Sequence, residues 1–266
     1  MSDHHFAGSI PDIYDRCLGP MLFRPFAEDL AARLAALPVH RVLELAAGTG
    51  IATSEVARAV PAGTRIVATD LHQPMLDVAA RRARATAVEF RTADAQDLPF
   101  ADGSFDAIYC QFGVMFLPDK NRAYRGMRRV LAPQGTLVFS VWDRLETSPI
   151  PATVASALAR LFPDDPPQFM SRIPHGYHDP AVIRDALSAA GFTEVTVEAV
   201  TLPSVAPSAR EVAVGFCQGT PLRHEITERD PEGLVTVTDA VTGAVADRFG
   251  DGTVSATMAA FVVTAR

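Results

Sequence analysis

The chain has 266 residues, of which 48% are hydrophobic and 21% charged, and its formal net charge is −7. Such a composition is typical of a globular protein with a substantial core, and the negative charge argues against nucleic acid as a partner. No segment reaches the roughly 20 apolar residues that span a bilayer, and residues 1–6 lack the pattern of a leader, so we expect a cytoplasmic protein. Cys17, Cys110 and Cys217 lack metal-ligand spacing, so we expect reduced thiols and no metal site.

Two helices are expected before the first strand. Ser9 to Arg16 contains an early proline, which is typical of a helix start. Met21 to Leu37 carries apolar residues four apart, which predicts one face packed on a core. Neither helix belongs to a minimal nucleotide-binding fold.

A strand, a turn and a helix follow. Val42 to Leu45 is an apolar run of the kind found in buried parallel strands, interrupted only by Glu44. Gly48 and Gly50 permit a tight turn and the close approach of a ligand to the backbone. Ile51 to Val60 has helical spacing, so the segment predicts a site for a nucleotide-type ligand.

The next strand, Thr64 to Thr69, ends at Asp70, twenty residues beyond Gly50. An acid at this spacing binds the ribose diol of a nucleotide, and its carboxylate has no need to be buried before the ligand binds. A dinucleotide fingerprint requires a third glycine, but that position holds Thr53. Glu44 would repel a pyrophosphate and suits a cationic ammonium or sulfonium, so the pattern favours S-adenosylmethionine over NAD.

Three further strands are expected in the same sheet. Val88 to Arg91 is followed by Asp94 and Ala95, and Phe105 to Cys110 is followed by Gln111. The carboxyl ends of parallel strands meet at one edge of an open sheet, where ligands bind. Gln111 is therefore expected at the same edge as the preceding acids, and residues 136–141 form the fifth strand.

Together these blocks resemble the class I SAM-dependent methyltransferases, especially the small-molecule enzymes related to ubiquinone and menaquinone C-methyltransferases. The resemblance implies an α/β fold with a Rossmann-like seven-stranded sheet of order 3-2-1-4-5-7-6, in which the last strand is antiparallel. One departure is Ala46, which stands where the family usually has its first glycine. The similar blocks are residues 42–50, Asp70, 94–100, 104–112 and 129–137.

The resemblance also implies a cofactor, S-adenosylmethionine, and a product, S-adenosylhomocysteine. It places the adenine amino group against Asp94, the adenine ring on the Ala95 amide and the ring faces between Leu71 and Met75, although Met75 is equally a candidate core residue. N-terminal helices close over the cofactor in such enzymes, so Tyr14 and Phe6 are either lid residues or packed on the core. The expected cofactor-binding residues are Glu44, Ala46, Gly48, Gly50, Asp70, Leu71, Met75, Asp94, Ala95, Gln111 and Tyr14.

The similar blocks end before Arg144. We expect residues 1–266 to form a single domain, with lid helices in 1–37 and substrate-cap elements in 144–178 and 203–250. Residues 215–222 are apolar with glycines and are expected to form a pocket wall. Helices are predicted over 153–162, 181–190, 208–216 and 231–249, and strands over 193–202 and 253–264.

The predicted reaction is in-line methyl transfer to an O, N or C nucleophile of a small molecule, performed by a monomer or homodimer. The sulfonium is already reactive, so no base is compulsory, and His175 and Tyr177 are the titratable candidates. Two alternatives remain: an NAD-type oxidoreductase and a SAM-binding protein without catalysis. The Asn/Asp-Pro-Pro-aromatic signature of enzymes that methylate nucleic-acid bases is absent after the fourth strand.

Overall fold

The computed structural model describes residues 10–83 and 88–266. Its contacts divide the chain into two compact units. The first comprises the chain up to Pro25 together with residues 142–176 and 201–259, and the second comprises residues 26–141, 177–200 and 260–266. The ranges 142–176 and 201–259 nearly coincide with residues 144–178 and 203–250, which are expected to form a substrate cap. That these segments cover the substrate stays a prediction.

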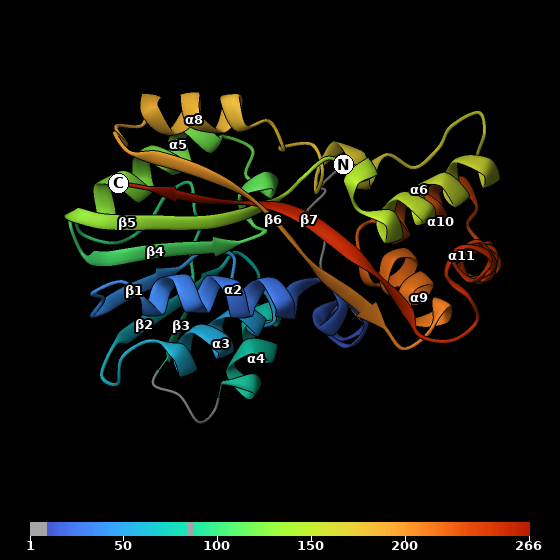
Figure 1. Cartoon of the computed structure of the whole chain (residues 1–266), viewed down its shortest axis with the longest axis horizontal. Coiled ribbons are helices and arrows are strands. Elements are labelled where there is room, and N and C mark those ends of the chain that lie inside the picture. The colour runs from blue at the N-terminus through green and yellow to red at the C-terminus, as the bar shows by residue number, and fades with distance from the viewer. Residues whose placement is uncertain (1–9, 84–87) are drawn as a thin grey trace. The chain divides into compact units, whose positions relative to one another are not determined.

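The second unit contains the core of a seven-stranded sheet with the order β3-β2-β1-β4-β5-β7-β6, as predicted (Figure 1). The pairs β3/β2, β2/β1, β1/β4 and β4/β5 are all parallel. Two contacts show that β7 runs antiparallel to β5. The Asp143 amide, just after β5, donates to the Ala259 carbonyl in the middle of β7, while Arg266 after β7 donates to the Thr136 hydroxyl in β5. The strands are β1 Arg41–Glu44, β2 Arg65–Asp70, β3 Val88–Thr92, β4 Phe105–Gln111, β5 Leu131–Trp142, β6 Val195–Ala206 and β7 Val254–Ala265.

Helices cover the apolar strands of this unit. Val42 and Leu43 in β1 and Ile108 in β4 are fully buried, which explains the continuous apolar runs in the sequence. α3 packs on α4, and α5 packs on α8, which Asp179 caps by accepting from the Ala181 amide. The helices are α2 Arg24–Ala35, α3 Ile51–Ala59, α4 Gln73–Arg82, α5 Lys120–Val130 and α8 Pro180–Ala189, with a 3-10 turn η2 at Val114–Phe116.

The first unit is mainly helical. Within it α11 packs along α9 and α6, and α9 also packs on η1 (Figure 1). No helix among residues 10–83 and 88–266 is long and apolar enough to cross a membrane. Its elements are α1 Ile10–Ile13, the π-helical η1 Tyr14–Phe23, η3 Leu145–Thr147, α6 Pro149–Leu161, α7 Phe169–Arg172, α9 Ala209–Gly219, α10 Leu222–Arg229 and α11 Leu234–Phe249.

One secondary-structure expectation is wrong. The expected break before Met21 is absent, because the π-helical segment η1 accommodates Pro20 and leads directly from α1 into α2. Residues 215–222, which are expected to form a pocket wall, belong mostly to α9 and α10, and their place in a pocket stays a prediction. Their glycines serve helix packing, since a Cβ on Gly215 would lie 2.6 Å from Leu18 and one on Gly219 would lie 3.0 Å from Ile13.

Candidate functional site

The turn between β1 and α3 adopts an unusual backbone. Gly48 and Gly50 have φ values of 56° and 77°, a region that side chains other than glycine rarely occupy. A Cβ on Gly50 would lie 2.7 Å from the Cβ and 2.9 Å from the Cα of Ala79, so α4 packs directly on this glycine. A Cβ on Gly48 would meet nothing within 4 Å. Gly50 therefore serves packing, whereas Gly48 exposes backbone to open space beside the strand end.

Ala46, the departure noted in the sequence, also has a positive φ of 54°. An alanine in this region costs on the order of 1–2 kcal/mol relative to an unstrained backbone. Its methyl group faces Gly113 after β4, where an added Cβ would approach the Ala46 Cβ to 2.5 Å. Phe112, next to Gly113, has a φ of 52°. The exits of β1 and β4 therefore both carry strained backbone where they meet.

Asp70 ends β2 and joins it to this turn. Its Oδ2 accepts the Gly48 amide and its Oδ1 accepts the His72 amide, both at 2.9 Å. The side chain is only 8% exposed, and burial raises the pKa of its carboxyl. The expectation that Asp70 need not be buried is therefore wrong, because the carboxylate also holds the turn. A carboxylate offers about four lone-pair sites, so each oxygen retains capacity for a ligand hydroxyl.

Glu44 ends β1 and is 1% exposed. The Thr53 hydroxyl of α3 donates to its Oε2 at 2.5 Å, and the Tyr109 hydroxyl of β4 faces the same carboxyl. Burial raises the pKa of Glu44 to about 8, opposed by the hydrogen bond from Thr53. Thr53 is thus the buried hydrogen-bond partner of Glu44. The sequence shows only that Thr53 stands where a dinucleotide fingerprint has its third glycine, and this does not reveal the role.

The residues expected around adenine lie after β2 and β3. Leu71 is 58% exposed, whereas Met75 in α4 is 4% exposed and packs in the core. Asp94 Oδ1 accepts the Gln96 amide at 2.8 Å and holds the turn that carries Ala95. Gln96 Oε1 in turn accepts the Asp119 amide at 2.9 Å, which ties this turn to the start of α5.

Gln111 is the last residue of β4 and pairs in register with Ser140 of β5. The Ser140 hydroxyl is buried and has no hydrogen-bond partner among the described residues. Glu44 is in register with Tyr109, two residues before Gln111 on the same face of the sheet. The structure therefore places Glu44, Asp70 and Gln111 at the carboxyl ends of three strands, as the sequence predicts.

The two residues considered as bases differ in their surroundings. His175, in the first unit, is 5% exposed, and its Nδ1 lies 2.7 Å from the Asp143 carbonyl oxygen. Tyr177, in the second unit, lies with its hydroxyl 3.2 Å from that of Tyr124. Burial raises the pKa of Tyr177, so its hydroxyl is neutral at physiological pH.

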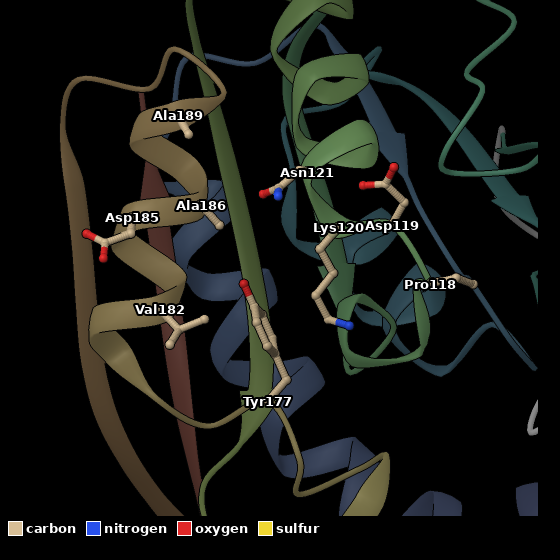
Figure 2. A pocket seen from close by; sticks show the side chains of 9 residues that line it. All are labelled: Pro118, Asp119, Lys120, Asn121, Tyr177, Val182, Asp185, Ala186 and Ala189. Carbon is tan, nitrogen blue, oxygen red and sulfur yellow. The ribbon is translucent and has the colours of Figure 1, made fainter.

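Tyr177 lines a cavity of about 530 Å³ between the start of α5 and α8 (Figure 2). The Lys120 Nζ lies 4.8 Å from the Tyr177 ring centroid and donates to the Leu117 carbonyl at 2.9 Å. Figure 2 shows Lys120, Asn121 and Tyr177 projecting toward the space between the helices, while Asp185 points away from it. Nothing in the residue pattern pairs Lys120 with Tyr177, so the sequence does not predict that Lys120 lines this cavity.

Tyr14, the described lid candidate, begins η1 in the first unit. Its ring stacks on Phe23 with the centroids 4.8 Å apart. Phe6 and the rest of residues 1–9 lie outside the described residues. Closure of a lid over the cofactor stays a prediction.

Comparison with known proteins identifies the family. The methyltransferase domain family matches residues 43–139. A demethylmenaquinone methyltransferase of Clavibacter sepedonicus is 33% identical over 192 residues, which are 66% of this chain and 76% of the relative. One from Thermobifida fusca strain YX is 32% identical over 213 residues, covering 74% of this chain and 89% of the relative.

Solved structures share the fold. The YcgJ protein of Bacillus subtilis superposes with a TM-score of 0.58 at 21% identity, covering 90% of this chain and 97% of that one. Phosphoethanolamine N-methyltransferase 2 of Haemonchus contortus, solved with phosphomonomethylethanolamine and S-adenosylhomocysteine, gives 0.60 at 18% identity, covering 96% and 56%. The relatives and the sheet order leave no support for an NAD-type oxidoreductase. The chain belongs to the class I SAM-dependent methyltransferases, in the broad group that includes the demethylmenaquinone methyltransferases.

Proposed function

We propose that this SAM-dependent methyltransferase transfers the methyl group to an O, N or C nucleophile of a small molecule by in-line displacement. The observation that carries the proposal is the pair of acids at the ends of β1 and β2, with the open Gly48 backbone beside them. Two carboxyl groups at this edge suit a ligand with a cationic end and a ribose diol.

Each cofactor contact is assigned by extension of this geometry. Glu44 faces the methionine ammonium, the open turn at Gly48 lets the ligand approach the backbone, and Asp70 accepts from the ribose hydroxyls. At the adenine end Leu71 covers the exposed face of the ring, and Asp94 accepts from its amino group. Ala46, Gly50, Met75, Ala95 and Gln111 shape the site around these contacts, and Tyr14 belongs to the proposed lid.

The chemistry asks little of the protein beyond positioning. A sulfonium methyl group is electrophilic without further activation, so holding the nucleophile in line and excluding water supplies most of the acceleration. The proposed cap segments, 144–178 and 203–250, select the acceptor. The relatives carry the name demethylmenaquinone methyltransferase, so a demethylmenaquinone is the first acceptor to assay.

Calorimetry with Asp70→Asn tests the cofactor assignment. Asparagine keeps the shape but loses the charge-assisted contacts to ribose, so we expect the affinity for S-adenosylhomocysteine to fall about ten- to a hundredfold. The melting temperature should also fall, because the Gly48 and His72 amides lose a charged acceptor. Binding is therefore measured well below the melting temperature of the variant.

The matched control is Asp102→Asn, whose carboxylate is 78% exposed and paired with Arg129. The control should bind S-adenosylhomocysteine like the wild type, and neither protein should bind NAD. Unchanged affinity in folded Asp70→Asn would restrict Asp70 to holding the turn and refute its ribose role. Failure of the wild type to methylate any acceptor while binding the cofactor would favour a SAM-binding role without catalysis.

A further inference from the structure

The carboxyl group of Glu44 is enclosed by neutral or acidic groups from three elements. Thr53 donates to it from α3 and Tyr109 faces it from β4, while Asp70 of β2 and Cys110 of β4 interact with it electrostatically. Among the described residues, no lysine, arginine or histidine acts on the Glu44 carboxyl, and the one charged side chain that does is Asp70. This arrangement surrounds a buried acid with partners that do not compensate a negative charge.

The neighbours differ in the charge they can carry. Burial raises the pKa of Asp70, but two backbone amides donate to its oxygens and favour the carboxylate. Burial raises the pKa of the Tyr109 hydroxyl well above 10 and that of the Cys110 thiol to about 12, so both remain neutral. An ionised Glu44 would therefore be a second buried negative charge beside Asp70. Burying such a charge without a cation costs several kcal/mol, so the proton is retained.

We propose that Glu44 is protonated in the ligand-free enzyme and releases its proton to solvent when the amino acid end of the cofactor binds. The inference rests on the proposed function, in which Glu44 faces the methionine ammonium. The ammonium supplies the cation that the enclosure lacks, and the carboxylic acid becomes a carboxylate paired with it. Cofactor affinity is thereby coupled to pH through a residue that does not react.

The expected size of the coupling follows from the pKa of Glu44, which is about 8 without ligand. A cation at ion-pair distance lowers the pKa of an acid by about one to three units. Binding at pH 7 should then release about 0.4 to 0.9 proton. Because the bound form favours the ionised acid, affinity rises with pH, by about three- to twentyfold between pH 6 and pH 7.5.

Calorimetry in buffers of different ionisation enthalpy measures the released proton directly. Titrations of the purified enzyme with S-adenosylhomocysteine and S-adenosylmethionine should each show the release. Titration with 5′-deoxy-5′-methylthioadenosine, which has the nucleoside but no amino acid, should show none. Release of the same size with this third ligand would assign the proton to the nucleoside end and overturn the proposal.

Three variants separate Glu44 from other sources of protons. Glu44→Gln should bind S-adenosylhomocysteine without release and with little pH dependence, whereas Glu89→Gln, a change at an exposed position of β3, should behave like the wild type. Thr53→Val keeps the carboxyl group but removes the hydroxyl that stabilises its charge, so its pH profile should shift to higher pH. This variant serves as the test if Glu44→Gln does not fold.

The outcomes distinguish the inference from the proposed function. If neither S-adenosylhomocysteine nor S-adenosylmethionine binds, the cofactor assignment itself fails. If both bind the wild type without proton release, or if the release persists in Glu44→Gln, the assignment stands and the coupling to Glu44 is refuted.

Discussion

The turn between β1 and α3 and the helices of the first unit are stabilised in different ways. In the turn, three residues have positive φ and a buried carboxylate holds the Gly48 amide. In the helices, apolar faces pack together, and threonine hydroxyls such as those of Thr153, Thr238 and Thr242 donate to carbonyls four residues earlier. The turn depends on individual backbone angles, whereas the helices depend on the sum of many packing contacts. The same type of substitution should therefore change the free energy of unfolding differently in the two regions.

The largest difference in stability between the two regions is expected when a glycine is replaced by alanine. Gly50→Ala places a methyl group 2.9 Å from the Ala79 Cα at a φ of 77°, so both strain and overlap destabilise the protein. We expect a loss of about 3 kcal/mol or more in the free energy of unfolding. Urea unfolding measures the loss.

Gly243→Ala is the matched change in the helical region. Gly243 lies within α11, and a Cβ there would meet nothing within 4 Å. Alanine in a helix interior should stabilise by about 0.5–1 kcal/mol, the opposite sign to Gly50→Ala. Two losses of similar size would show that the contrast between the regions is unfounded.

A smaller effect is expected at Glu225 in α10, whose carboxylate accepts three hydrogen bonds. Its Oε2 accepts the amides of Gln168 and Phe169, and its Oε1 accepts from Arg172 at 3.0 Å. Glu225→Ala leaves the start of α7 uncapped and should cost about 1–2 kcal/mol, measured by thermal and urea unfolding. Glu228 also lies in α10 but is exposed, so Glu228→Ala should change the free energy of unfolding by less than about 0.5 kcal/mol.

The smallest effect is expected at Ala46. Ala46→Gly removes the strain of a φ of 54° but increases the entropy of the unfolded chain, so we expect a net gain of about 0.5–1 kcal/mol. Ala52→Gly in α3, where the backbone is helical, should instead lose about 1 kcal/mol. Destabilisation by Ala46→Gly would mean that the methyl contact with Gly113 outweighs the strain.

Much of the site could be predicted from the sequence because its chemistry is local. The apolar run before Gly48 predicted β1, and the spacing to Asp70 placed the acid at the end of β2. Adjacent parallel strands must bring such positions to one edge, so the positions of Glu44, Asp70 and Gln111 followed from strand order alone. The N-terminal helices were predicted less well, because the chain absorbs Pro20 in a π-helical segment that has no clear sequence signal.

The sequence by itself predicted the strands, the edge that carries the acids and the family, because hydrophobic period and motif spacing are properties of short segments. The strand order followed from the resemblance to that family. Only the tertiary structure decided the state of those acids. The burial of Asp70, the hydrogen bond of Glu44 with Thr53, and the contact of Ala46 with Gly113 all join residues from different elements. Solvent exclusion at a strand end depends on what packs over it, and residue spacing carries no information about that.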